Sequence, residues 1–215
     1  MTDSAKKITK IERQERNRSR YSIFLDGEYA FGLDEEIVFD GKIALDQILR
    51  EEKIAELLLA DERKRAKTKA FRFLSIRDHS ERELAEKLRR SGFTNDIVRV
   101  LVEELRERRY LNDETFAKSF ARSKIVRKPI GRRGMTDELK RKGIAESILE
   151  STLDSVYSEF DEMDLAKRLA KKKIHLLKND DRMKVKKSLS DFLMRRGFGW
   201  EIVEEVLNEV VTDAS

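Results

Sequence analysis

One pattern occurs three times in this chain: a leucine, a glycine four residues later, and an isoleucine five residues after the glycine. The three copies are Leu88, Gly92 and Ile97; Leu139, Gly143 and Ile148; and Leu193, Gly197 and Ile202. The glycines lie 51 and then 54 residues apart. A fixed period of this size is typical of a repeat architecture, in which one small unit is used several times.

Each copy predicts the end of one helix and the start of another. Leu84 and Leu88 are one helical turn apart and share a face, and Gly92 accepts the left-handed conformation that ends a helix. A further amphipathic stretch precedes each copy, at residues 66–74, 116–126 and 165–177. The unit is therefore three helices. We predict a mainly α fold, an elongated tandem array of three three-helix repeats at residues 61–109, 110–158 and 159–215.

Polar residues mark where several of these helices begin. Ser80 and Glu83 have the spacing of a capping box, and Asn112 and Asp161 precede apolar helical positions as caps. The polar run at residues 179–181 predicts a break between the first two helices of the third repeat.

Residues 1–60 form a different kind of segment. Apolar and polar residues alternate on both sides of Asp26-Gly27, which predicts a β-hairpin over residues 20–33. Residues 1–19 are polar and basic, which suggests a mobile arm. An isolated hairpin is marginally stable, so we expect a third strand to pair with it, from residues 37–39 or 42–45. We then expect a helix that is capped by Asp46 and runs through Ile48 and Leu58.

Composition narrows the class of protein. The chain has 215 residues, no cysteine and 41% charged residues, which excludes disulfides and thiol chemistry and favours many small cores over one thick core. No stretch is apolar enough for a signal peptide or a membrane span. We expect a cytoplasmic, monomeric protein.

Charge is unevenly distributed along the chain. Residues 118–142 hold ten basic and two acidic side chains, and residues 164–196 hold twelve basic and four acidic ones. Single cations usually only solvate a helix, but two segments with a net charge of +8 each favour a polyanion or an acidic protein groove as partner. The predicted binding residues are Arg132, Arg133, Lys140, Arg141, Lys171, Lys172, Lys186, Lys187, Arg195 and Arg196.

Catalytic and metal-binding patterns are weak. His79 lies beside a helix cap, and we interpret it as a solvated loop residue; His175 has no matching ligand pattern. Gly41-Lys42 lacks the remaining residues of a phosphate loop. The acidic pairs Asp113-Glu114 and Asp137-Glu138 are explained by helix starts. We predict no enzyme activity and no cofactor.

The chain resembles the RecX family of bacterial recombination regulators over roughly residues 61–211. The resemblance lies in 70–74, in 80–93 with the first glycine pattern, in the string Tyr-Leu-Asn-Asp-Glu-Thr-Phe-Ala at 110–117, in Gly131-Arg-Arg, and in 138–144. Residues 1–60 resemble the extension of members from Gram-positive bacteria. The chain departs from the pattern at Gly134-Met135, where the family more often has a good helix former.

The resemblance implies tandem three-helix repeats without catalytic residues. It also implies a protein that binds the RecA recombinase and its filament on single-stranded DNA, and that inhibits strand exchange and ATP hydrolysis. Two other functions stay open on the residues alone. One is a helical repeat that binds DNA or RNA directly without RecA specificity, and the other is a hydrolase, which would require a metal or a nucleotide.

Overall fold

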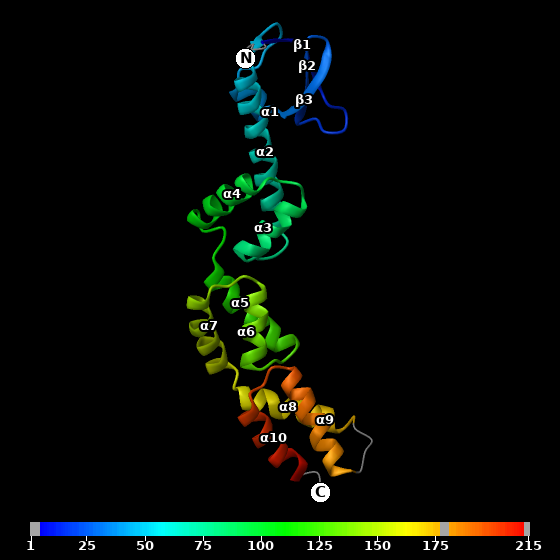
Figure 1. The fold of residues 1–215 in the computed structure, drawn as a ribbon, viewed down its shortest axis with the longest axis vertical. Helices are drawn as coiled ribbons and strands as arrows, with labels where there is room; N and C mark the ends of the chain where they lie inside the picture. Colours follow the sequence, from blue (N-terminus) through cyan, green and yellow to red (C-terminus); the bar gives the residue numbers. More distant parts are fainter. Residues whose placement is uncertain (1–4, 177–180, 213–215) are drawn as a thin grey trace. The chain divides into compact units, whose positions relative to one another are not determined.

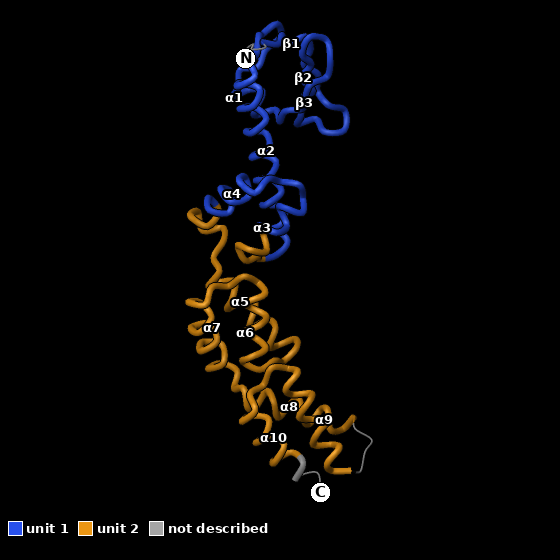
Figure 2. Tube along the Cα trace, in the orientation of Figure 1, with its two compact units in different colours: residues 1–77, 85–104 blue, residues 78–84, 105–215 orange. Residues whose placement is uncertain are grey.

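The computed structural model describes residues 5–176 and 181–212 of the chain, which divides into two compact units (Figures 1 and 2). Unit 1 comprises residues 1–77 and 85–104, and unit 2 comprises residues 78–84 and 105–215. The described elements are β1 (Lys6–Arg13), β2 (Arg20–Leu25), β3 (Glu28–Asp34), α1 (Glu35–Asp40), β4 (Ile48–Leu49), α2 (Glu51–Leu74), α3 (Glu81–Arg90), α4 (Asn95–Glu107), α5 (Asp113–Arg127), α6 (Arg132–Arg141), α7 (Glu146–Glu159), α8 (Glu162–Ile174), α9 (Arg182–Arg195) and α10 (Trp200–Thr212).

The N-terminal element is a four-stranded antiparallel sheet with the order β3-β2-β1-β4. The predicted hairpin at Asp26-Gly27 is confirmed, with both residues at positive φ between β2 and β3. The expectation of a mobile arm was wrong over residues 6–13, which form β1. The reason is a register shift between Ile8 and Lys10 in the pairing with β2. This shift separates the inward-facing Ile8 and Ile11 by three residues, so the alternation that signals a strand is broken.

Two other expectations for this region were also wrong. Residues 37–39 lie in α1, whose start is capped by the Asp34 side chain, and residues 42–45 form no strand. Asp46 does not cap a helix, because its φ is 66° and Ile48–Leu49 pairs with β1 instead. The helix begins at Glu51 and continues without a break to Leu74. The predicted boundary at residues 60 and 61 therefore falls inside α2.

A buried carboxylate attaches the sheet to α2. Asp61 is 2% exposed, and its two oxygens accept hydrogen bonds from the Arg20 guanidinium at 3.0 and 3.1 Å. Arg65 Nε and the backbone N–H of Asp34 also donate to this carboxylate, at 2.9 and 2.8 Å. A charge buried this deeply is tolerated only when its lone pairs are satisfied, as they are here.

The three predicted repeats are confirmed as helices α2–α4, α5–α7 and α8–α10. Gly92, Gly143 and Gly197 end α3, α6 and α9 with φ of 91°, 82° and 75°, the conformation that the pattern predicted. The repeated apolar positions are fully buried: Leu84, Leu88, Met135, Leu139, Leu189 and Leu193 are all 0% exposed. The repeats therefore share one core design.

The predicted helix starts are confirmed where the chain is described. The side chains of Ser80, Asn112 and Asp161 each accept a hydrogen bond from a backbone N–H three residues later. Asp181 likewise caps α9, while the rest of the expected break, residues 179 and 180, lies outside the described residues.

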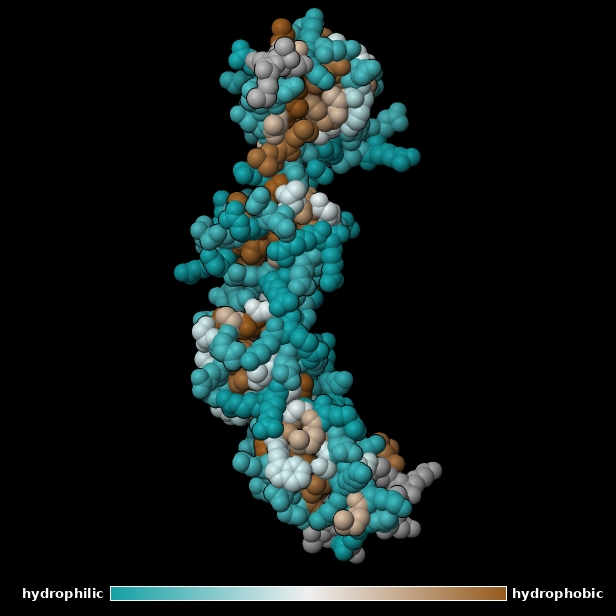
Figure 3. Space-filling view, in the orientation of Figure 1, coloured by the Kyte–Doolittle hydropathy of each residue, from teal (hydrophilic) through white to brown (hydrophobic). Residues whose placement is uncertain are grey.

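Most of the molecular face in Figure 3 is hydrophilic, and the apolar residues on it form separate patches. Among the described helices, none is both long and apolar enough to cross a membrane. The buried apolar residues of the second and third repeats form one continuous cluster that includes Phe116, Leu139, Leu165 and Leu193. These two repeats therefore share a core within unit 2.

Candidate functional site

The start of each of the first two middle helices is held by an acid from the following repeat. The backbone N–H of Glu81, the first residue of α3, donates to Asp113 Oδ1 at 2.9 Å. In the same way, the N–H of Arg132, the first residue of α6, donates to Glu162 Oε1 at 2.8 Å. Asp113 and Glu162 are the first residues of α5 and α8, so the same contact is built twice. We call these two carboxylates the junction acids.

Burial raises the pKa of both junction acids, and the backbone hydrogen bond opposes the rise only in part. Because a raised folded-state pKa favours the protonated folded form, the folded state gains stability as pH falls through that pKa and loses it as pH rises. Each junction acid therefore stabilises the fold through its hydrogen bond to a backbone N–H, but its burial as a charged group opposes this gain.

We expect Glu162→Gln and Glu162→Ala to have opposite effects on stability. Glutamine keeps an acceptor for the Arg132 N–H without a buried charge, so its variant should be at least as stable as the parent at neutral pH. Alanine leaves that N–H without this acceptor and should cost about 1–3 kcal/mol. Urea unfolding at neutral pH and near the ordinary glutamate pKa of 4.5 measures both. Equal stabilities of the two variants would contradict this account.

At the junction of the second and third repeats the backbones approach very closely. The N–H groups of Gly131 and Gly134 donate to the carbonyls of Arg196 and Gly197 at 2.9 and 3.3 Å. A Cβ on Gly131 would lie 2.5 Å from the backbone N of Phe198, and one on Gly134 would lie 2.9 Å from the Arg196 oxygen. This contact explains why α6 contains Gly134 at a position where a good helix former is expected.

Side chains also hold the link between α5 and α6. The Tyr157 hydroxyl donates to the carbonyl of Ile130 at 2.8 Å, and Arg196 Nη1 donates to the carbonyl of Pro129 at 3.2 Å. Arg196 also lies over the ring of Phe192, at 5.2 Å from its centroid. The carbonyls of Pro129 and Ile130 are therefore both held by side chains, one of them from the residue that precedes Gly197.

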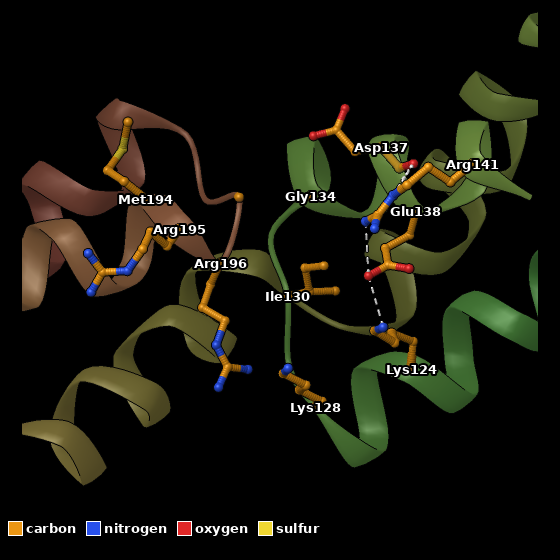
Figure 4. Close-up of a pocket in the computed structure, with 11 residues that line it drawn as sticks. Lys124, Lys128, Ile130, Gly134, Asp137, Glu138, Arg141, Met194, Arg195 and Arg196 are labelled. Atoms are coloured by element: carbon orange, nitrogen blue, oxygen red, sulfur yellow. Dashed lines mark hydrogen bonds and ion pairs between the residues drawn. The ribbon is translucent and has the colours of Figure 1, made fainter.

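A groove of about 230 Å³ lies at this junction, and Figure 4 shows the residues that line it. We call it the basic groove. Its lining residues are Lys124, Lys128, Ile130, Gly134, Asp137, Glu138, Arg141, Met194, Arg195, Arg196 and Gly197. Five cations and two acids give this groove a net positive charge, which suits an anionic group of a partner.

The cations of the basic groove have different roles. Glu138 accepts from Lys124 Nζ at 3.0 Å and pairs with Arg141 at 3.2 Å (Figure 4). Partial burial raises the pKa of Glu138, but Lys124 and the neighbouring positive charges outweigh burial and lower it. By contrast, Lys128 and Arg195 have no ion pair with any described residue. Their charges are thus available to a ligand.

The structure separates the predicted binding residues into several groups. Arg141, Arg195 and Arg196 come together in the basic groove, whereas Lys172 lines a different groove. Arg132 pairs with Asp154, and Lys140 pairs with Glu146 at 3.1 Å. Of the remaining predicted residues, Arg133, Lys171 and Lys187 are solvent-exposed, and Lys186 is half-buried.

Sequence reasoning missed two cations of the groove, Lys124 and Lys128. Both lie in the basic segment 118–142, but their place at the end of α5 gave no sign that they would meet α9. The interpretation of His79 as a solvated loop residue was wrong. His79 is 2% exposed and the adjacent Ser80 is 0% exposed. The Ser80 hydroxyl donates to the Lys142 carbonyl at 2.6 Å, so the residues just before α3 are buried against the second repeat.

No group of three or more histidine, aspartate and glutamate side chains in the described part of the chain is arranged to hold a metal ion. His175 is exposed at the end of α8.

Four family models match consecutive parts of the chain. They describe the regulatory protein RecX N-terminal domain, over residues 6–50, and the first, second and third three-helix domains of RecX, over residues 66–105, 112–153 and 161–207. The matches coincide with the sheet and the three repeats.

Relatives of this chain match it over nearly the whole length of both proteins. A regulatory protein RecX of Clostridium perfringens is 32% identical, covering 96% of this chain and 97% of that protein, and one of Caldanaerobacter subterraneus is 34% identical, covering 94% and 98%. A crystal structure of a regulatory protein RecX matches with a TM-score of 0.71 at 28% identity, covering 95% of this chain and all of that one. A RecX structure from Lactobacillus salivarius, 23% identical, has the same fold, with a TM-score of 0.62 over 70% of this chain and 97% of that one. The chain belongs to the RecX family of regulatory proteins.

Proposed function

We propose that this chain binds the RecA recombinase and its filament on single-stranded DNA, and that it inhibits strand exchange and ATP hydrolysis. Family membership along nearly the whole chain supports a regulatory role. The structural observation that carries the proposal is the basic groove, in which Lys128 and Arg195 have no ion pair with a described residue. We further propose that the protein acts in the cytoplasm as a monomer, without catalysis or a cofactor.

The groove suits a filament for a physical reason. A nucleoprotein filament presents acidic side chains and DNA phosphates at regular intervals, and both are anions that lysine and arginine bind. A repeat protein can contact several such groups at once, and modest contacts then combine through effective concentration. The exposed cations on α8 and α9, Lys171 and Lys187, would add to the same attraction.

We expect the double charge reversal of Lys128→Glu with Arg195→Glu to weaken inhibition. Two repulsive contacts should raise the concentration needed for half-inhibition about tenfold or more. The measurement is the ATPase activity of RecA on single-stranded DNA against the concentration of this protein. The matched control reverses Arg90 and Arg99, which are 81% and 69% exposed at their side chains and lie in the first repeat.

Each result of this experiment has a distinct meaning. Equal potency of the groove variant and the control would remove the basic groove from the proposal. If the parent protein itself did not inhibit RecA, the assignment of RecA as partner would be refuted. Circular dichroism of each variant checks that the helices are retained.

Direct binding of DNA or RNA is the second candidate function, favoured by the two basic segments at residues 118–142 and 164–196. Phosphate binding weakens steeply with salt, by about one logarithmic unit per neutralised phosphate for each tenfold rise in salt. Binding to RecA in the absence of DNA, measured at two salt concentrations, separates a protein contact from a purely phosphate-based one.

A further inference from the structure

A second groove lies in unit 2, between the end of α5 and the face of α8 that carries Arg168 and Lys172. Its volume is about 300 Å³, and we call it the apolar groove. Its lining residues are Ile125, Val126, Arg127, Pro129, Phe160, Arg168, Leu169 and Lys172. The lining thus consists of five apolar residues and three cations, with no acid.

The apolar side chains of this groove are exposed to different degrees, and Val126 is the most exposed. Val126 is 70% exposed, although it lies in a helix whose neighbouring residue Ile125 is 1% exposed. Leu169 and Phe160 are half-buried beside it. Exposed apolar surface next to a preformed hollow is typical of a binding site for an apolar side chain.

The cations around the groove have no acidic partner among the described residues. Arg168 and Lys172 are four residues apart on α8 and therefore share a face, where two like charges repel each other. Neither forms an ion pair with a described residue. Arg127 donates to the hydroxyl and the carbonyl oxygen of Ser123, at 2.7 and 3.3 Å. A bound anion would relieve this repulsion.

These observations restrict the kind of ligand. A phosphate or a nucleic acid backbone would use the cations and leave the apolar surface exposed to water. A purely apolar segment would leave three positive charges without partners. The volume is at the small end of the range for ligand pockets, so it accommodates one or two large side chains. A short acidic segment that carries a large apolar residue meets all three conditions.

We propose that the apolar groove binds a short acidic segment of a protein partner. A leucine or phenylalanine of that segment packs against Val126, Pro129 and Leu169, and its carboxylates pair with Arg168 and Lys172. The inference goes beyond the proposed function, because it does not require the partner to be RecA.

The link between α5 and α6 borders both grooves. Pro129 lines the apolar groove, while its neighbours Lys128 and Ile130 line the basic groove. The two grooves therefore border one short segment but have no lining residue in common.

The test is fluorescence anisotropy of a labelled synthetic peptide, rich in aspartate and glutamate with a central Leu-Phe pair, titrated with the full-length protein. We expect binding that is weakened about tenfold or more by Arg168→Glu with Lys172→Glu. Val126→Ser should also weaken it. The control reverses Arg90 and Arg99, which are exposed in the first repeat and do not line the groove, and should change the affinity less than about twofold.

Several outcomes would overturn the proposal. The first is failure of the parent protein to bind the peptide. The others are equal binding by the Arg168→Glu, Lys172→Glu variant and equal binding of a peptide with alanines in place of Leu-Phe. Competition by a single-stranded DNA oligonucleotide at similar strength would instead make the groove a phosphate surface. Self-association that disappears in the groove variant, seen by sedimentation velocity, would assign the groove to a second copy of this chain. Unchanged thermal melting of the variants excludes loss of the fold as the cause.

Discussion

Gly197→Ala should destabilise unit 2 by about 2–5 kcal/mol, whereas Gly92→Ala should cost only about 1–2 kcal/mol. Both glycines end the middle helix of a repeat, and both have positive φ, at 75° and 91°. A side chain at either position pays the cost of the left-handed conformation. Only at Gly197 does it also overlap another backbone, because a Cβ there would collide with the N and Cα atoms of Gly134.

Gly92 provides a matched control, since no atom lies within 4 Å of the position that its Cβ would occupy. Chemical unfolding of the two variants measures the difference, and hydrogen exchange at Gly131 and Gly134 reports whether their hydrogen bonds to the third repeat are lost. If both substitutions cost the same, the overlap with Gly134 would add nothing to the cost of the left-handed conformation, contrary to this prediction.

Truncation of the repeated leucines should have a similarly large effect. Leu88, Leu139 and Leu193 are each 0% exposed, so Leu→Ala at any of them removes buried methyl groups and leaves a cavity, at a cost of about 2–5 kcal/mol. The three costs should be of similar size, because the residues occupy the same position in three copies of one unit.

Leu176→Ala is the control for this series, because Leu176 is 74% exposed and its truncation should change stability by no more than about 0.5 kcal/mol. Urea unfolding followed by circular dichroism gives all four values. A stability for Leu139→Ala or Leu193→Ala close to that of the control would show that the buried leucines do not support the repeats as described.

The repeats were predictable because their signals are local. A glycine at a helix end and a leucine one turn earlier act within a few residues, so the three copies of the pattern located the ends of α3, α6 and α9. The caps at Asn112 and Asp161 are equally local, since each side chain bonds to a backbone N–H three residues away.

The N-terminal sheet was predictable only in part. The turn at Asp26-Gly27 determines its own conformation, but β1 is a strand only because it lies between β2 and β4. Its irregular register with β2 also hides its alternation from the sequence. The start of α2 was misplaced for a related reason: Ile48–Leu49 pairs with the start of β1, a partner 41 to 43 positions earlier in the chain that local propensity cannot reveal.

The candidate site was the least predictable part. The charge of the segments indicated a polyanionic or acidic partner, but ion pairs within the fold engage Arg132 and Lys140, while Lys128 and Arg195 have none with a described residue. Both pairings join α6 to α7, so they depend on how these two helices pack against each other. Gly134 shows the same limit, because in the sequence it is only a departure from the family pattern, and in the structure it makes room for the third repeat.

The buried Asp61 carboxylate determines which side of α2 the sheet packs against. Its hydrogen bonds come from β2, from the end of β3 and from α2 itself, and breaking such a set costs about 3–5 kcal/mol. Ala66 and Ala70, further along the same helix, are buried where the first repeat begins. Because an α-helix turns by about 100° per residue, one residue inserted between Asp61 and Ala66 would swing the sheet to another side of the helix, while about seven would return it close to its original heading. The number of residues between Asp61 and Ala66 thus determines on which side of α2 the sheet packs.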